Sequence, residues 1–260
     1  MDEMSRLTQK FYGDGNGAGW YETQMGKSPE YALKLFELFK QEGIIPEDEE
    51  LEGFTLVDVS ANRAELEVHL AVLLDRQIKG QEFVHSPKVI AIDFLGKKEG
   101  EKEDGSYDRF VSGIQPEKIP NLKNVEFSRI SADARQLPLA EGSVDVLFDR
   151  LGALWYSVHD KGGGLRRDKT FLELQKIVLE ILKNYARTLK EKGKIIVDAT
   201  QKGMYLNQVK SEKSTAVALS EVGLSTPRGL QDLEDIGLRV KFVGKGADRL
   251  LVFEKVDKNK

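Results

Sequence analysis

The stretch that most constrains the fold is residues 54–64, Phe-Thr-Leu-Val-Asp-Val-Ser-Ala-Asn-Arg-Ala. Its first half is an apolar, partly β-branched run, short enough for a central strand of a parallel sheet. Residues 64–78 follow with leucines at helical spacing. The turn from Asp58 to Asn62 therefore joins the carboxyl end of a strand to the start of a helix. Ligands bind at such turns in open α/β sheets, because backbone donors and the helix dipole point into a crevice.

Strand and helix patterns alternate along the rest of the chain. Six further strands are predicted by apolar or alternating runs at residues 87–94, 124–131, 144–148, 195–199, 238–243 and 249–254. Amphipathic helices are predicted at residues 28–43, 171–190 and 230–236, each closed or followed by a glycine. For the 171–190 helix we expect Gly193 to act as the C-cap. Strands that alternate with helices favour a sheet that is mostly parallel.

Composition narrows the function classes. The 260 residues carry 43 acidic and 39 basic side chains, for a net charge of −4. This balance gives no clear nucleic-acid signal. The chain has no cysteine, which excludes disulfides and thiolate catalysis, and its three histidines are scattered, so no metal site is predicted. The N-terminus does not resemble a signal peptide and no apolar run has transmembrane length, so we expect a cytoplasmic protein without membrane contact. The sequence does not set an oligomeric state.

The turn after the first strand resembles the first motif of class I S-adenosylmethionine (SAM)-dependent methyltransferases, acid-x-Gly-x-Gly-x-Gly. Asp58 matches the acid, while Ser60, Asn62 and Ala64 stand at the three glycine places. Serine and alanine are small, and asparagine tolerates the left-handed region, so these residues can keep the shape of the turn. The resemblance implies that Asp58, Ser60 and Asn62 contact SAM.

The second predicted strand ends in Asp93, followed by Phe94. In the family, an acid at this place accepts hydrogen bonds from the ribose hydroxyls, which implies that Asp93 and Phe94 are cofactor contacts. The same chemistry occurs in NAD sites, where the acid lies about 20 residues beyond the glycine turn. Asp93 lies further along than that, and the glycines are missing. Both features disfavour an oxidoreductase.

The most specific match runs from Asp133 to Asp149. It is similar to the family pattern Asp-Ala, Leu-Pro-apolar, a short turn and a Ser/Phe-Asp-apolar strand. In the family, the acid lies near the adenine amino group and the next backbone amide faces a ring nitrogen, which implies these roles for Asp133 and Ala134. A carboxylate beside an N–H suits adenine, which offers one donor and adjacent acceptors. A surface turn capped by Asp133 is the alternative.

Asp149 ends the fourth predicted strand, a place that faces the methionine moiety and the methyl group in the family. It is a candidate to accept a proton from the acceptor or to pair with the SAM amine, with a cap for the next helix as the alternative. Tyr156 is the second candidate proton handler. Trp155 and Tyr156 either wall the acceptor pocket or belong in part to the core. His159 is either a base or a surface residue.

Two segments have open roles. The glycine-rich residues 1–27 are either a lid with aromatic side chains or a flexible extension. The basic loop at residues 160–168 is either a clamp for an anionic acceptor or a plain linker. We divide the chain into an N-terminal lid and helical extension, residues 1–50, and a SAM-binding methyltransferase domain, residues 51–260.

The resemblance covers residues 54–256 and implies an α/β fold with a doubly wound, Rossmann-like sheet of seven strands, mostly parallel with an antiparallel C-terminal hairpin. It implies an enzyme that moves the methyl group of SAM to an unidentified nucleophilic acceptor. We expect a small-molecule acceptor in preference to a macromolecule. A SAM-fold binding module without catalytic activity is the alternative.

Overall fold

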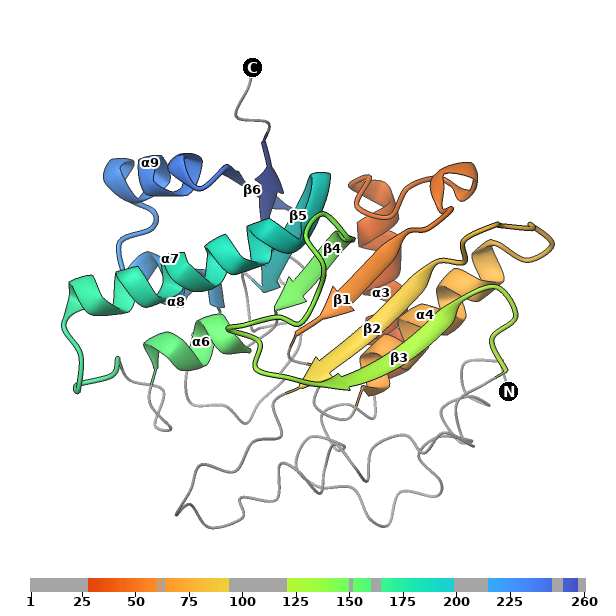
Figure 1. Ribbon diagram of the computed structural model, residues 1–260, viewed down its shortest axis with the longest axis horizontal. Helices are drawn as coiled ribbons and strands as arrows, with labels where there is room; N and C mark the ends of the chain where they lie inside the picture. The colour runs from red at the N-terminus through yellow and green to blue at the C-terminus, as the bar shows by residue number, and fades with distance from the viewer. Residues whose placement is uncertain are drawn as a thin grey trace, which may run out of the picture.

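The computed structural model describes residues 28–59, 61, 64–93, 121–149, 152–159, 165–198, 215–244 and 250–256. Seven strands form one sheet in the order β3-β2-β1-β4-β5-β7-β6 (Figure 1). They are β1 (Thr55–Asp58), β2 (Lys88–Asp93), β3 (Glu126–Ser131), β4 (Val144–Asp149), β5 (Leu189–Asp198), β6 (Leu238–Val243) and β7 (Leu250–Lys255). Strands β1 to β5 run parallel, and β7 runs antiparallel to both β5 and β6. The predicted fold class is confirmed.

Helices cover both faces of the sheet (Figure 1). They are α3 (Ser28–Gln41), α4 (Glu65–Gln77), α6 (Ala153–Val158), α7 (Phe171–Thr188), α8 (Thr215–Glu221) and α9 (Pro227–Asp235), with a 3-10 turn η1 (Asp48–Glu50). Val57 and Val59 of the first strand and its turn pack with α6 and α7, whereas Leu56 packs with α3 and α4. This alternation follows from the two-residue period of a strand. None of the described helices is long and apolar enough to cross a bilayer.

The helix α3 is built into the core. Its side chains Ala32, Leu35, Phe36 and Phe39 are buried in one cluster with α4 and the sheet, and the Phe39 ring meets Phe148 of β4 edge to face at 6.0 Å. The division of the chain at residue 50 stays a prediction. The glycine-rich residues 1–27 lie outside the described residues.

The junction between α7 and β5 differs from the prediction. The strand starts at Leu189, directly after the helix, and the pairing with β4 then jumps from Val144↔Leu189 to Val146↔Lys194. A bulge of three extra residues takes up the difference. The left-handed residue is Lys192, with φ 61°. A Cβ at Gly193 would lie 3.0 Å from the Val144 carbonyl oxygen, so the predicted helix C-cap is wrong, and the glycine permits a close approach to β4 instead.

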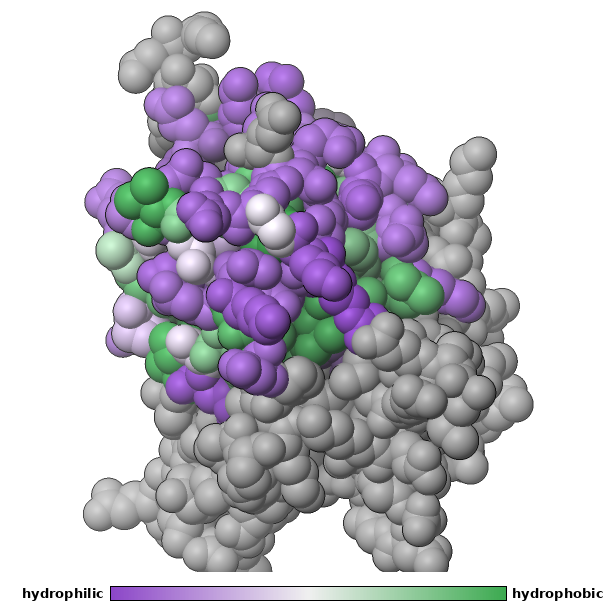
Figure 2. All heavy atoms as spheres, turned by 90° about the vertical axis from the view of Figure 1, so that its right-hand side faces the viewer, coloured by the Kyte–Doolittle hydropathy of each residue, from purple (hydrophilic) through white to green (hydrophobic). Residues whose placement is uncertain are grey.

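The side of the molecule formed by β3 and α4 carries a mainly hydrophilic surface among the described residues (Figure 2). Strand β3 is the edge strand there among the described strands, and Glu126 at its start pairs with Lys88 of β2 at 3.1 Å. Charged side chains on an edge strand oppose pairing with another chain. The edge strand on the other side of the described sheet is β6, which pairs with β7.

Candidate functional site

Four acids lie at one edge of the sheet. Asp58, Asp93 and Asp149 are the last residues of β1, β2 and β4, and Asp133 follows the end of β3 by two positions. These four strands are neighbours and parallel, so their carboxyl ends share an edge. The strand order reverses between β1 and β4, which is the switch point where open α/β sheets bind ligands. For Asp93, the structure describes the position of the backbone only.

The turn after β1 is held by both neighbouring strands. The Val59 amide donates to the Phe148 carbonyl at 2.9 Å, and the Ala61 amide donates to the Ile92 carbonyl at 3.1 Å. Ser60, Asn62 and Phe94 lie outside the described residues. Ala64 adopts the left-handed region, with φ 62° and ψ 24°, directly before α4. The third glycine place of the motif therefore keeps a backbone conformation typical of glycine.

Asp149 is fully buried and its carboxylate accepts three hydrogen bonds. The amides of Gly152 and Leu154 donate at 2.9 and 3.2 Å, and the Tyr185 hydroxyl of α7 donates at 2.9 Å. The first two donors belong to the start of α6. Asp149 thus caps α6, which is the role that the sequence left open beside catalysis.

Both ionisable side chains of this network, Asp149 and Tyr185, have raised pKa values. Burial, opposed by the three donors, raises the pKa of Asp149 to about 7, and the charge of Asp58 adds to the rise. Burial raises the pKa of Tyr185, with further contributions from Asp149, Asp58 and Asp133. Three carboxylates from three strand ends therefore act on one phenol. Sequence reasoning placed Tyr185 only on the apolar stripe of α7, and no local signal distinguishes it from a core tyrosine.

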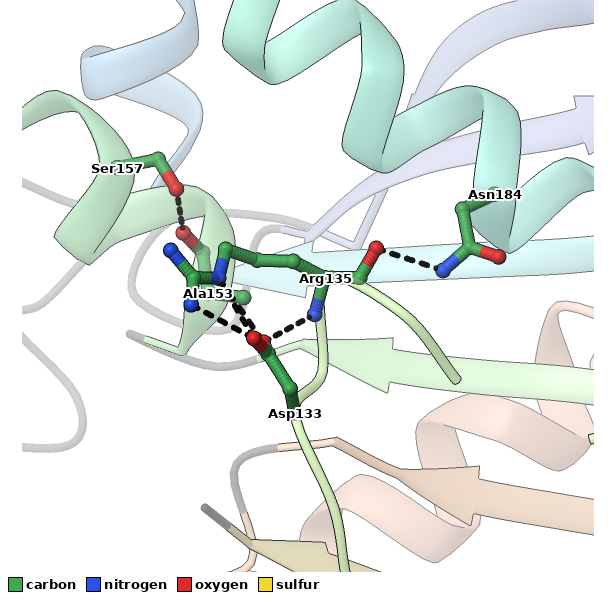
Figure 3. A network of polar contacts seen from close by, with 5 residues as sticks. All are labelled: Asp133, Arg135, Ala153, Ser157 and Asn184. Atoms are coloured by element: carbon green, nitrogen blue, oxygen red, sulfur yellow. Dashed lines mark hydrogen bonds and ion pairs between the residues drawn. The ribbon is translucent and has the colours of Figure 1, made fainter. Parts of the chain in front are cut away.

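The Asp133 carboxylate is held by Arg135 (Figure 3). The guanidinium Nη2 lies 2.6 Å from Oδ2, Nε lies 2.9 Å from Oδ1, and the Arg135 amide also donates to Oδ1 at 2.9 Å. These bonds lower the pKa of Asp133. The Arg135 carbonyl accepts from the Asn184 side chain of α7 at 2.9 Å, and Ala134 is buried. Hydrogen bonds within the turn and to α7 therefore hold residues 133–135 in place. The sequence did not indicate a role for Arg135.

The residues of α6 separate into core and surface. Tyr156 is 65% exposed, while Trp155 is buried and stacks on the imidazole of His159 at 3.9 Å. His159 is also buried, and its Nε2 lies 2.9 Å from Glu221 Oε2 at the end of α8. The surface alternative for His159 is wrong, because tertiary packing supplies both a stacking partner and a carboxylate. Among the described residues, no group of three or more acids and histidines could hold a metal ion.

The strand order and the terminal antiparallel pair match the sheet expected from the resemblance. The chain has the doubly wound, Rossmann-like fold that the resemblance to class I methyltransferases implied. The resemblance stated from the sequence is thus confirmed at the level of the fold. Carboxylate oxygens at the ends of neighbouring strands accept hydrogen bonds from hydroxyl and amino groups, which are polar groups that a SAM molecule carries.

Comparisons with known proteins give structural likeness only. No family model matches the chain, and no curated protein matches it. A SAM-dependent methyltransferase from Aquifex aeolicus is 19% identical, with a TM-score of 0.43 and 98% of each chain covered. A putative SAM-dependent methyltransferase from Methanococcus maripaludis is 14% identical, with a TM-score of 0.44 and coverage of 95% of this chain and 99% of that one.

A third similar structure corrects one prediction. It is a 16S rRNA adenine-N1 methyltransferase from Catenulisporales acidiphilia, 14% identical, with a TM-score of 0.44 and coverage of 89% of this chain and 93% of that one. That enzyme acts on a nucleic acid. The prediction of a small-molecule acceptor in preference to a macromolecule was wrong. The cytoplasmic location stays a prediction.

Proposed function

We propose that the chain is a SAM-dependent methyltransferase that binds its cofactor along the carboxyl ends of β1 to β4. One observation carries the proposal: the strand order gathers Asp58, Asp93, Asp133 and Asp149 at one sheet edge, on both sides of the switch point. Because the acids are distributed over four neighbouring strands, they can bind a long ligand with several polar groups better than a compact ligand.

Each part of the cofactor has a proposed partner. Asp93, with Phe94 beside it, would take the ribose, and Asp133 with the Ala134 amide would take the adenine. Asp58, Ser60, Asn62 and Asp149 would surround the methionine end. Bound SAM supplies a methyl group on a positively charged sulfur, which a nucleophile can displace in line. The chain would contribute alignment and the exclusion of water.

Asp149 and Tyr156 remain the proposed proton handlers. A pKa of about 7 suits Asp149 to exchange a proton near neutral pH. Its three hydrogen bonds fix the carboxylate in place, so an acceptor would have to reach an oxygen that already has partners. Tyr156 presents its side chain at the surface of α6. The acceptor is not assigned.

Calorimetry with SAM, S-adenosylhomocysteine (SAH) and NAD tests the cofactor. We expect both adenosyl ligands to bind and NAD not to bind. Asp93→Ala should weaken SAM binding at least about tenfold, since a carboxylate that accepts from the ribose is worth about 1.5–3 kcal/mol. The matched control is Glu126→Gln, which changes an acid at the opposite end of the neighbouring strand and should leave SAM affinity unchanged.

Transfer of labelled methyl groups from SAM tests the reaction. The acceptors would be the RNA, protein and small-molecule fractions of a cell extract, supplied separately. Label in any fraction, absent without the protein, supports the enzyme. SAM binding without transfer to any fraction would favour the binding module instead. Binding of NAD alone would reject both.

A further inference from the structure

The turn after β3 contains two peptide groups that are hydrogen-bonded to each other. The Gln136 amide donates to the Asp133 carbonyl at 2.9 Å, which joins the peptide group 135–136 to the peptide group 133–134. The peptide bonds of the described chain are trans, and in a trans peptide the carbonyl and the amide point in opposite directions. The Ala134 amide therefore points away from Gln136. The position of the Gln136 amide thus sets the direction of the Ala134 amide.

A side chain of α7 holds the other end of this pair of peptide groups. Asn184 Nδ2 donates to the Arg135 carbonyl at 2.9 Å, across 49 positions of the chain (Figure 3). That carbonyl belongs to the same peptide group as the Gln136 amide, so the hydrogen bonds run in series from Asn184 to the Ala134 amide. Hydrogen bonds in series polarise one another, which strengthens the last donor.

Arg187, three positions later on α7, fixes which way the Asn184 amide faces. Its Nη2 donates to Asn184 Oδ1 at 3.3 Å. Since a guanidinium only donates, the oxygen of Asn184 lies on the side of Arg187 and its NH2 group faces the Arg135 carbonyl. The same guanidinium donates to the carbonyls of Leu137 and Leu139, at 3.3 Å each. Arg187 therefore holds both Asn184 and the segment that follows the turn.

Ala134 lies at the end of this series of hydrogen bonds. The residue is only 6% exposed, and in the described part of the chain no group accepts a hydrogen bond from its amide. Buried backbone amides are nearly always paired, so this amide is available to a ligand. Beside it, the Asp133 carboxylate is an acceptor. A donor next to an acceptor is complementary to the amino group and the adjacent ring nitrogen of adenine.

On the basis of the proposed function, we propose that Asn184, oriented by Arg187, is a positioning residue that sets the adenine specificity of the site. The role needs no contact between either side chain and the cofactor. Asn184 holds the Ala134 amide in the direction of the ring nitrogen and, through the turn, holds the Asp133 carboxylate at the amino group. Without the Asn184 donor the two peptide groups can rotate, and the turn can then accept a base with the opposite hydrogen-bond pattern.

S-Inosylhomocysteine is the probe that tests this role. It differs from SAH only in the base, where a carbonyl oxygen replaces the amino group and the adjacent ring nitrogen carries a hydrogen. Donor and acceptor are therefore exchanged at the two positions that face Asp133 and Ala134. Calorimetry with both ligands gives the ratio of their dissociation constants. We expect wild type to prefer SAH by about 100-fold or more, because a polar site rejects an analogue that leaves its groups unpaired.

Two variants remove the proposed contacts. Asn184→Leu keeps the approximate size of the side chain and removes the donor, so we expect it to reduce the preference for SAH by about five- to tenfold, the effect of one hydrogen bond. Arg187→Met keeps an unbranched side chain, removes the guanidinium and should reduce the preference by about two- to threefold. The matched control is Lys183→Ala, which changes the exposed neighbour of Asn184 on α7 and should keep the wild-type ratio.

The ratio of the two affinities separates positioning from a general loss of stability. A variant that only loosens the fold weakens the binding of both ligands by the same factor and leaves the ratio unchanged. An unchanged ratio in Asn184→Leu would therefore overturn the inference. If Asn184→Leu does not fold, an unchanged ratio in Arg187→Met overturns it instead.

The outcomes also separate this inference from the proposed function. If neither SAM nor SAH binds to wild type, the proposed function fails and the inference fails with it. If SAH binds and the variants keep the wild-type preference, only the inference fails. If wild type binds SAH and S-inosylhomocysteine equally, the turn does not read the base. That result would overturn the inference and the adenine roles of Asp133 and Ala134, while cofactor binding itself would stand.

Discussion

His159 Nε2 lies 2.9 Å from Glu221 Oε2, and this contact joins the end of α6 to the end of α8. The imidazole is buried and stacked on Trp155, whereas the Glu221 side chain is 27% exposed. The pair therefore connects α6 and α8, which follow the adjacent strands β4 and β5 in the chain.

His159→Ala is expected to lower the free energy of unfolding by about 2–3 kcal/mol, because it removes a packed ring and leaves a cavity beside Trp155. Urea unfolding followed by tryptophan fluorescence measures this change. His85→Ala serves as the control, because His85 is exposed, and should stay within about 0.5 kcal/mol of wild type. A His159 variant as stable as that control would mean that the pair does not fasten α6 to α8.

The protonation of Asp149 should be visible in the stability of the protein. Its folded pKa of about 7 lies above the ordinary 3.8, so the folded state holds the proton more tightly than the unfolded chain. The associated stability is present below about pH 4 and is lost as pH rises to about 7, by up to about 4 kcal/mol. Urea unfolding of wild type and Asp149→Asn at a series of pH values checks this.

The quantity to compare is the difference in the free energy of unfolding between wild type and Asp149→Asn, because the other titrating groups are present in both proteins. Wild type should lose stability relative to Asp149→Asn as pH rises from about 4 to about 7, and the difference should level off above that. A difference that is constant with pH would show that Asp149 is ionised throughout.

Ala64→Gly should stabilise the fold by about 1 kcal/mol. Ala64 has φ 62°, where a Cβ is strained and glycine is not, and this relief exceeds the entropy that glycine adds to the unfolded chain. Chemical unfolding gives the value. Ala71→Gly, within the right-handed helix α4, should have the opposite sign. Destabilisation by both changes to the same extent would argue against a left-handed Ala64.

Arg135→Gln should tighten SAM binding by about two- to fivefold. The guanidinium occupies both oxygens of Asp133, and an ion pair at this degree of exposure is worth about 0.2–1 kcal/mol. Asp133→Asn, in contrast, should weaken SAM binding because it removes the acceptor proposed for the adenine amino group. Calorimetry at fixed salt compares the two. Weaker binding by Arg135→Gln would indicate that Arg135 itself contacts the ligand.

Local patterns were sufficient to locate the strands. β6 has its predicted bounds, and β2, β3 and β7 begin or end within two residues of the prediction, because alternation and apolar runs are properties of neighbouring residues. The α7–β5 junction was missed. Its bulge exists because Gly193 packs against the backbone of β4, about 50 residues earlier in the chain, which no local pattern encodes.

The four acids were also visible in the sequence, since each one ends or follows a predicted strand, and parallel strands bring their ends to one edge. What the sequence did not contain was the state of each carboxylate. Asp149 accepts a hydrogen bond from Tyr185, 36 positions away. Asp133 is paired with Arg135, and nothing in the sequence distinguishes this arginine from one exposed to solvent. The order of the strands and helices, and the position of each acid at or after a strand end, can be predicted from the short-range periodicity of the sequence. Burial, pairing and proton affinity depend on which distant groups exclude water from them, and only the folded structure decides that.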